Sequence, residues 1–412
     1  MKTTRKGILI SNSRSTLTVE TYGHDENDRE QLIGSYEGRI LIGLSLGYLV
    51  IQFGRNILSP LLPTIIDDLQ ITSFQAGIAL SLISATYALS MYPGGRLSDQ
   101  LSRKSILVSA GLLSLAAMIL LALAHQYWIL LMGAGILGLG AGFYWISLRA
   151  LLADLFTQRR GEAFGIQESL GFGGPLLAAG GAIVILAIAH WRHAFLPVIV
   201  FLAVVVLFSH WWIDEPYAIQ LVDLDIAATI KRVFGDGKTR RLLIGYTSAI
   251  FAMQAVIGFL PLFLQVEHGF SDTLSSVGFG VLFLGAIVTL PIAGFLGDRF
   301  GYMAVAVGGL LISLIALIGF LFSSSAVIIL VCVFGFGIGI WGFPPVIQAF
   351  LMTHFPTESM GGDYGAFKTV YAGVGSLGPA YVGYVAGILD YLTAFLGLIV
   401  FLVIAMVIFY RV

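Results

Sequence analysis

Apolar runs of about 20 residues follow one another along nearly the whole chain after residue 38, and short polar stretches separate them. A run of this length crosses a bilayer as a helix, because lipid offers no partner to unpaired backbone N–H and C=O groups. Charged residues make up only 11% of the chain, whereas a soluble domain has about 25%. We count twelve such runs. The sequence therefore predicts an all-α membrane protein with twelve transmembrane helices, whose surroundings are the lipid bilayer.

The apolar runs divide the chain into four segments. We expect a polar tail at 1–38, a six-helix half at 39–213, a central polar loop at 214–241 with a short surface helix at 219–234, and a second six-helix half at 242–412. The expected spans of the first half are 40–66, 74–92, 106–124, 128–152, 163–189 and 194–213. Those of the second half are 242–264, 274–296, 304–322, 327–352, 363–387 and 391–410.

Two similar polar motifs indicate that the halves repeat one plan. The first, GRLSDQLSRK, begins at Gly95, and the second, GFLGDRFGYM, begins at Gly294. Their acids, Asp99 and Asp298, lie 298 − 99 = 199 positions apart in a chain of 412 residues. A glycine pattern, GLGAG at 138–142, is echoed by GFGIG at 335–339. We therefore expect two pseudo-symmetric halves whose helices approach closely at these small residues.

Both motifs resemble the G-x-L-x-D-R-x-G-R-K signature of the major facilitator superfamily. The first keeps Gly95, Leu97, Asp99, Arg103 and Lys104, and the second keeps Gly294, Leu296, Asp298, Arg299 and Gly301. The first departs from the signature at Gln100 and Ser102, and the second at Tyr302 and Met303. The resemblance implies a monomeric carrier that works by alternating access, with the motifs as loops after helices 2 and 8 and spans 1, 4, 7 and 10 around a central cavity.

The resemblance also implies gating residues. In this family the acid and bases of the first motif work with an acid at the end of span 4, which here gives Asp99, Arg103 and Asp154. The further residues expected at the gates are Gly95, Gly294, Asp298 and Arg299. Thr353 and His354 stand near the matching acid position of the second half, so we expect a weaker gate there.

Basic residues predict the orientation of the chain. The loops on the side of the two motifs carry nearly all the Lys and Arg, and the opposite loops carry only Arg192. Cytoplasmic loops are enriched in these residues. We therefore expect the motifs and both termini to face the cytoplasm, in a multi-pass protein of the plasma membrane.

Four ionised residues lie at depth in the expected spans. They are Arg55 in span 1, Arg149 in span 4, Glu168 in span 5 and Lys368 in span 11. Such residues are costly in a bilayer and often mark function. Adding the repeat offset of 199 places Gln254 opposite Arg55 and Gln348 opposite Arg149, on spans 7 and 10. Lys368 takes the position that corresponds to Glu168.

These residues predict an anion-binding site. Arg149 and Glu168 lie at similar depth on adjacent helices and could form a pair, which leaves Arg55 and Lys368 without an obvious partner. Guanidinium groups favour carboxylate or phosphate. We expect a small organic anion to bind at Arg55, Arg149, Gln254, Gln348, Lys368 and Trp341, with Glu168 as the candidate proton carrier. Each residue also has a structural interpretation: an internal latch, a snorkelling lysine or interhelical hydrogen bonds.

Three functions compete for this sequence. The first is secondary transport of a small organic anion by proton symport or anion exchange. The second is efflux of lipophilic drugs by proton antiport, but its family signature expects an Arg at Ala134 and glycines at Ala178 and Ala179. The third is a transporter-like sensor, which needs a larger soluble domain than the polar segments provide.

No motif indicates an enzyme. The sequence shows no nucleophile motif, phosphate loop or metal-ligand cluster, and Cys332 is the one cysteine. We expect no cofactor, no metal and no nucleic-acid partner.

Overall fold

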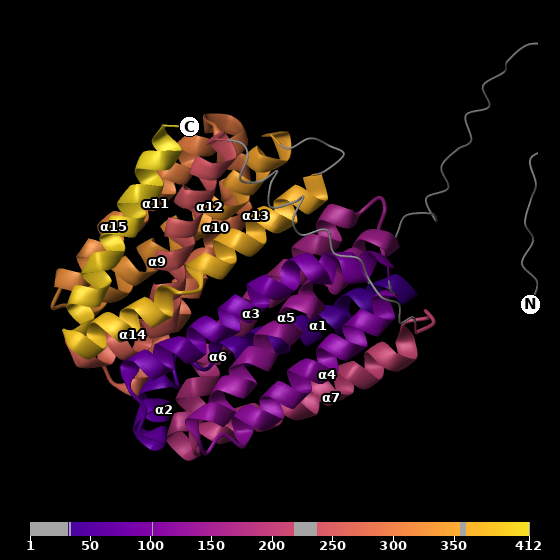
Figure 1. Ribbon diagram of the computed structural model, residues 1–412, viewed down its shortest axis with the longest axis horizontal. Helices are drawn as coiled ribbons and strands as arrows, with labels where there is room; N and C mark the ends of the chain where they lie inside the picture. Colours follow the sequence, from indigo (N-terminus) through magenta and orange to yellow (C-terminus); the bar gives the residue numbers. More distant parts are fainter. Residues whose placement is uncertain (1–31, 33, 101, 218–236, 355–359, 412) are drawn as a thin grey trace, which may run out of the picture.

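The structure is a computed structural model that describes residues 32, 34–100, 102–217, 237–354 and 360–411. It is nearly all helical and forms two bundles side by side, coloured indigo to magenta and orange to yellow in Figure 1. The first bundle contains α1 (Tyr36–Asn56), α2 (Leu62–Leu69), α3 (Ser73–Gln100), α4 (Arg103–Ala122), α5 (Tyr127–Leu155), α6 (Arg160–Ile188), η2 (Trp191–Phe195) and α7 (Leu196–Trp212). The second contains α9 (Gly237–His268), α10 (Asp272–Phe300), α11 (Tyr302–Phe322), α12 (Ala326–His354), α13 (Met360–Gly375), α14 (Gly378–Ile388) and α15 (Tyr391–Tyr410).

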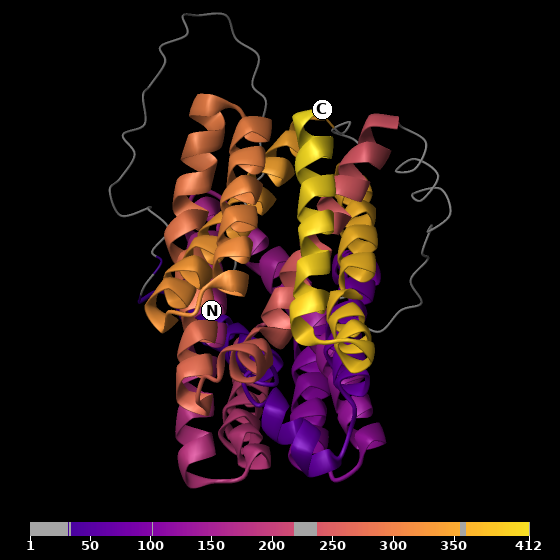
Figure 2. The same cartoon turned by 90° about the vertical axis from the view of Figure 1, so that its left-hand side faces the viewer.

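The transmembrane helices agree with the predicted fold class. Within the described residues, 10 helical segments are long and apolar enough to cross a membrane, with η2 and α7 acting as one. Helix α1 and the broken pair α13–α14 add two further spans, which gives twelve. The view turned by 90° in Figure 2 shows the same division into two bundles. The bundles meet where α3 packs on α13 and α14, and where α6 packs on α10.

Two expected spans are broken helices, so their predicted bounds were wrong. The run 40–66 consists of α1, a turn after Asn56, and the short helix α2, which begins at Leu62. The run 363–387 is divided between α13 and α14 at 376–377. Prolines explain both breaks. Pro60 lies in the turn that connects α1 to α2, and Pro63 and Pro379 lie in the first helical turns of α2 and α14. Proline lacks an N–H and suits a helix start better than a helix interior.

Within the described residues, the larger part of each polar motif is helical, whereas the sequence predicted loops. Helix α3 continues through Gly95 to Gln100, and α10 continues through Gly294 to Phe300. Both helices therefore extend beyond their apolar segments into the polar motifs. The second turn uses Gly301 at φ +91°, a conformation that glycine adopts without strain. In the same way α9 already begins at Gly237, inside the predicted loop 214–241, whose expected helix at 219–234 lies outside the described residues.

The glycine patterns bring helices into backbone contact, as expected. A Cβ atom on Gly138 of α5 would overlap the carbonyl oxygen of Ile83 on α3. A Cβ atom on Gly337 of α12 would overlap the carbonyl oxygen of Leu282 on α10. Small residues allow such approach between membrane helices. The same kind of packing thus recurs once in each bundle.

Candidate functional site

The two ends of the bundles differ in how closely the bundles meet. We call the end that holds the two polar motifs the motif end, and the opposite one the far end. At the far end, a Cβ atom on Gly77 of α3 would lie 2.5 Å from the carbonyl oxygen of Pro379, and one on Gly383 would overlap the carbonyl oxygen of Ser73. On the motif side, a Cβ atom on Gly165 of α6 or Gly365 of α13 would meet no atom within 4 Å. The bundles are therefore in backbone contact at the far end, whereas these two glycines near the motif end face open space.

Serine hydroxyls join the bundles at the far end. Ser59, in the turn between α1 and α2, donates to the carbonyl oxygens of Ile257 at 2.6 Å and Gly258 at 2.9 Å on α9. Pro261 lies four residues after Ile257 and has no N–H, so the helix itself cannot pair the Ile257 carbonyl. Ser59 supplies the missing donor. The backbone hydrogen bond that Pro261 cannot form in α9 is thus replaced by a hydrogen bond from the other bundle.

Two serines of α3 continue this contact toward the centre. Ser81 Oγ accepts a hydrogen bond from the backbone N–H of Ala380 at 2.9 Å. Ala380 lies in the first turn of α14, where an N–H has no partner within its own helix. Ser84 Oγ accepts from Gln254 Nε2 at 2.8 Å. We call Ser59, Ser81 and Ser84 with these partners the far-end seal, and its first two contacts fill backbone positions that broken or kinked helices leave open.

An ion pair joins α5 and α6 of the first bundle. Arg149 Nη1 of α5 lies 2.9 Å from Glu168 Oε1 of α6, so the pairing expected from the sequence is present. Trp145 Nε1 donates to the same carboxylate oxygen at 3.2 Å. The guanidinium of Arg149 lies 5.0 Å from the Trp145 ring centroid and 4.5 Å from that of Phe164. Both charged side chains are about one-third exposed, 29% and 33%, so neither is sealed in the protein interior.

Lys368 carries this cluster across to the second bundle. Its Nζ lies 3.7 Å from the centroid of the Trp145 ring, a close cation–π contact. Lys368 is on α13, whereas Trp145, Arg149 and Glu168 are on α5 and α6. We call these four residues the central cluster. Its formal charge is two positive and one negative, which leaves one positive charge in excess.

Arg55 lies on a tyrosine face near the end of α1. Its guanidinium carbon is 4.2 Å from the ring centroid of Tyr87 on α3, and Tyr87 is hydrogen-bonded to the side chain of Tyr48. No ion pair holds Arg55 within the described residues. The sequence indicated an unpaired cation here, and the structure adds the aromatic surface that supports it.

The remaining predicted binding residues fall into different positions. Gln254 is a member of the far-end seal, which is the interhelical role considered in the sequence. Trp341 packs edge-to-face on Phe172 of the first bundle, with ring centroids 4.9 Å apart, and its buried Nε1 has no hydrogen-bond partner. Gln348 is half-buried on α12, two turns toward the motif end from Trp341. Trp341 thus lies between the bundles with a free donor.

The predicted gating residues form contacts within each bundle. Arg103 Nε lies 3.1 Å from Asp154 Oδ2, which joins α4 to α5. Asp298 accepts a hydrogen bond from Tyr302 at 2.9 Å, and the guanidinium of Arg299 lies 5.5 Å from the ring centroid of Phe300. The predicted gating residues whose side chains lie outside the described part are Asp99, Thr353 and His354. A Cβ atom on Gly95 would approach Ile146 to 3.5 Å, whereas one on Gly294 would meet nothing within 4 Å.

Comparison with known proteins decides the family. The sequence model of the Major Facilitator Superfamily matches residues 44–379. The chain belongs to the major facilitator superfamily. A Haemophilus influenzae protein named for metabolite transport is 27% identical over 379 residues, covering 88% of this chain and 92% of that protein. The multidrug resistance protein MdtG of Klebsiella pneumoniae is 22% identical, covering 82% and 84%. The "Probable sulfoacetate transporter SauU" of Cupriavidus necator is 25% identical over 63% of this chain and 64% of that protein.

Solved structures agree with this fold. A bacterial homolog of the human lysosomal transporter Spinster, in an inward-facing and unoccupied conformation, superposes with a TM-score of 0.78 at 18% identity. The alignment covers 92% of this chain and 97% of that one. A mutant of the nucleoside transporter NupG gives the same TM-score at 14% identity, covering 92% and 99%. The major facilitator fold is therefore shared across these chains.

The sequence analysis missed the uncharged residues of the candidate site. Tyr87 is one example, because a single tyrosine in an apolar run is common. Ser59, Ser81 and Ser84 are others, although Ser59 precedes a proline and Ser81 and Ser84 are spaced to share one helix face. Such spacing could have suggested a contact, but not its partner on the other bundle.

A polar cluster at the far end also lay outside the predicted site. Asp68 of α2 accepts from Trp191 Nε1 at 3.2 Å and His190 Nε2 at 3.1 Å, and Arg192 Nη1 lies 2.7 Å from its carboxylate. Burial raises the pKa of Asp68, but the hydrogen bonds from Trp191 and His190 and the charge of Arg192 outweigh it, so the pKa is lowered. This cluster fastens α2 to η2.

Proposed function

We propose that this superfamily member is a secondary transporter of a small organic anion, and that Arg55, Arg149 and Lys368 attract it. The observation that carries the proposal is a charge imbalance in the central cluster and on Arg55. Within the described residues, these side chains comprise three cations and one carboxylate, that of Glu168. All three cations rest on aromatic rings. A cation–π contact is worth about 0.5–2 kcal/mol, less than a desolvated charge needs, so an anion has a favourable place to bind.

The geometry of the central cluster supports a carboxylate or phosphate ester as the ligand. Arg149 shares one N–H with Glu168, and a guanidinium has five N–H donors in a fork that fits two oxygens. Trp341 offers a further buried donor from the second bundle. Aromatic faces from Trp145 and Phe164 border the Arg149 guanidinium, which suits a ligand with a charged head and an apolar body.

We infer that Glu168 couples transport to protons. It is hydrogen-bonded to Arg149 and Trp145, so its ionised form occupies donors that a substrate anion would use. Protonation of Glu168 would free the Arg149 guanidinium for the substrate. Proton and anion would then bind together, which is symport. Direct displacement of Glu168 by the anion would instead give exchange.

The relatives bear on two substrate classes. One relative is named for sulfoacetate, a small organic anion, and others are named for multidrug resistance. The excess positive charge of the central cluster favours an organic anion over a lipophilic drug as the substrate. The second candidate, efflux of lipophilic drugs, draws support from the aromatic rings around Arg55 and Arg149, which would also hold an apolar molecule.

We infer that the structure represents the conformation open to the cytoplasm. Basic residues gather at the motif end, which is the side that faces the cytoplasm in most membrane proteins. The far-end seal and the room beside Gly165 and Gly365 then correspond to a carrier closed outside and accessible inside. Alternating access requires the reverse arrangement as a second state.

Thermal unfolding of the purified chain tests the substrate class. The ligand panel holds mono- and dicarboxylates, sulfonates, phosphate esters, neutral sugars and lipophilic amines. A ligand at 100 times its Kd adds about 2.7 kcal/mol to stability. We expect an anion to stabilise the wild type and Arg240→Gln, an exposed control on α9, but to stabilise Arg55→Gln much less. Stabilisation by amines alone, equal in all three proteins, would reject the anion and favour drug efflux.

A further inference from the structure

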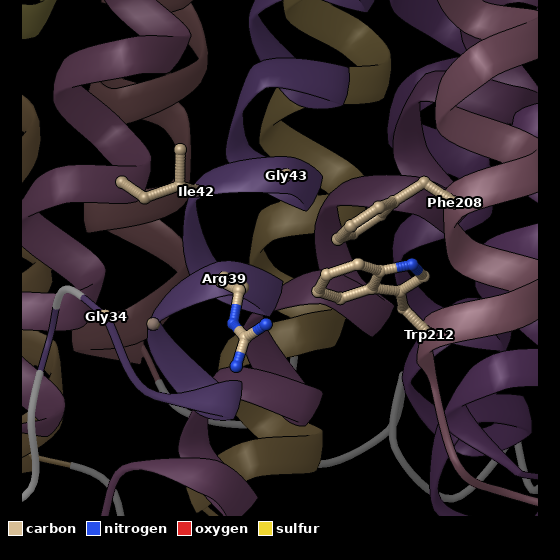
Figure 3. A pocket seen from close by; sticks show the side chains of 7 residues that line it. Gly34, Arg39, Ile42, Gly43, Phe208 and Trp212 are labelled. Atoms are coloured by element: carbon tan, nitrogen blue, oxygen red, sulfur yellow. The ribbon is translucent and has the colours of Figure 1, made fainter.

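A groove at the motif end of the first bundle lies apart from the central cluster. It encloses about 340 Å³ between α1 and α7 and is lined by Gly34, Arg39, Ile42, Gly43, Phe208 and Trp212. Figure 3 shows Arg39 of α1 facing the rings of Phe208 and Trp212 of α7. The lining is apolar except for one cation. Such a groove suits an occupant with an anionic head and an apolar body.

The wall of the groove is a stacked aromatic pair. Phe208 and Trp212 lie with ring centroids 5.0 Å apart and an interplanar angle of 27°. A Cβ atom on Gly43 would lie 2.5 Å from the Phe208 ring, so the glycine lets this ring reach α1. Tyr36 donates to the backbone carbonyl of Trp212 at 2.7 Å and fixes the end of α7. The groove is therefore held in shape by its own contacts.

Arg39 is available to an anion in this groove. Its guanidinium carbon lies 5.3 Å from the Trp212 ring centroid, and its Nε donates to the carbonyl oxygen of Ser35 at 3.3 Å. No acidic side chain pairs with it within the described residues. Its side chain is exposed, and most of its N–H donors remain free for an oxygen ligand.

The groove opens at the edge of a lipid-facing surface. The exposed residues of α7 include Val200, Val204, Leu207 and Trp211, and their spacing of four, three and four places them along one side of the helix. Trp212 follows at the end of this stripe, and tryptophan is typical of the boundary between lipid and water. A phospholipid at this place would have its headgroup at Arg39 and its chain along the stripe.

A second groove has the same composition. It also encloses about 340 Å³, lies at the motif end between α11 and α15, and is lined by Val307, Met406, Val407, Tyr410 and Arg411. Again one arginine and one interfacial ring border an apolar wall. Helix α15 corresponds to α7 in the repeat, because the offset of 199 places Val407 at the position of Phe208 (208 + 199) and Arg411 at that of Trp212 (212 + 199). Helix α11 has no such relation to α1, so the two grooves are built on one repeated and one different helix.

We propose that the α1–α7 groove binds an anionic phospholipid, with its phosphate on Arg39 and its acyl chain against Ile42 and Phe208. Neutral lipids lack the extra charge that the surface basic residues of a membrane protein attract. Bound lipid would bridge α1 and α7 at the motif end and stabilise the first bundle. The proposal does not depend on the identity of the transported substrate.

The test compares lipids in thermal unfolding of the full chain in detergent, with added phosphatidylglycerol, phosphatidylcholine or inorganic phosphate. We expect phosphatidylglycerol to raise the Tm above the value in phosphatidylcholine, and inorganic phosphate to have no effect. Arg39→Gln should lower the phosphatidylglycerol increment by about half, and the double change with Arg411→Gln should abolish it. Arg240→Gln, exposed on α9 and outside both grooves, should keep the full increment.

Three outcomes would overturn the proposal. Equal Tm values in the two lipids would show that headgroup charge is not recognised. An unchanged increment in Arg39→Gln would place the lipid elsewhere. A phosphatidylglycerol increment that appears only after deletion of residues 1–31, which carry the acidic run around Asp25, would make that segment and not the lipid the occupant. Counting bound phosphatidylglycerol by native mass spectrometry gives an independent readout, with one fewer molecule expected in Arg39→Gln.

Discussion

Arg149 and Glu168 lie where the two bundles face each other, and their ion pair is connected to both. Trp145 donates to the same carboxylate oxygen as Arg149, and Lys368 of the second bundle lies over the Trp145 ring. A change in the charge of Glu168 therefore affects groups on α5, α6 and α13 together. At the scale of single residues, this carboxylate is the natural point of control.

Replacing Glu168 by Gln removes the charge but keeps an oxygen that can accept from Trp145. We expect anion uptake into proteoliposomes to lose its response to an imposed pH gradient, while exchange of internal for external anion persists. Breaking the pair should cost about 1–2 kcal/mol of stability, less than for a buried pair because both side chains are partly exposed. Glu162→Gln, which alters an exposed pair with Arg159, is the control. Gradient-driven uptake by E168Q would show that the proton is carried elsewhere.

At the scale of helices, the far-end seal depends on the kink in α9. Ser59→Ala leaves the Ile257 carbonyl without a donor, because Pro261 cannot supply one. An unpaired buried acceptor costs about 1–3 kcal/mol, so the closed far end should be populated several-fold less. Hydrogen–deuterium exchange should become faster in 57–61 and 262–264. Ser248→Ala, whose hydroxyl bonds Ile244 in its own helix, should leave exchange there unchanged, and equal exchange in both variants would contradict the role of Ser59.

The attachment of α2 to η2 predicts a pH dependence. The pKa of Asp68 is lowered in the folded protein, so its stabilising effect is complete above the unfolded value of about 3.9 and is lost as the pH falls through the lower folded value. Asp68→Asn should unfold at a lower temperature than wild type at pH 7, with the difference shrinking below about pH 4. Thermal unfolding from pH 7 to pH 3 measures this. A difference that stays constant across the range would show that the charge of Asp68 is not what fastens α2.

At the scale of the whole molecule, physics explains which features the sequence predicts. The spans and the repeated halves are predictable because lipid sets helix length and the motifs repeat at half-chain spacing. The pair Arg149–Glu168 is predictable because charges in apolar runs are rare, and the pair Arg103–Asp154 is what the resemblance of the first motif to its family implies. The far-end seal is different: the hydroxyls of Ser114 and Ser209 bond carbonyls of their own helices, and only the fold distinguishes them from Ser81.

The helical form of the polar motifs was equally hidden. Glycine and charged residues between apolar runs usually indicate a loop, and propensity alone cannot show that a buried helix extends past the bilayer. Pro60 and Pro379 are visible in the sequence, but a proline in a membrane helix can be tolerated without a break, and the spans were predicted as continuous. Tertiary packing decides between these outcomes.

Alternating access predicts that the far end must open during each cycle. Ser81→Cys with Ala380→Cys, in a Cys332→Ala background, places one thiol on each bundle at a position where Ser81 Oγ and the Ala380 N–H are 2.9 Å apart. Cross-linking by a short thiol reagent should stop transport, and reduction of a cleavable linker should restore it. Each single cysteine variant, treated alike, is the control. Full transport by the cross-linked protein would exclude far-end opening as a step.

The far-end seal also determines what surroundings the carrier can sense. Its described contacts between the bundles are hydroxyls, a carboxamide and backbone groups, none of which carries a net charge. Mobile ions screen exposed ion pairs such as Arg103–Asp154 at the motif end, but they do not weaken uncharged hydrogen bonds in the same way. Salinity on the far side is therefore expected to leave these contacts between the bundles unaltered. Closure of the far end should then be insensitive to the ionic strength of the compartment that it faces.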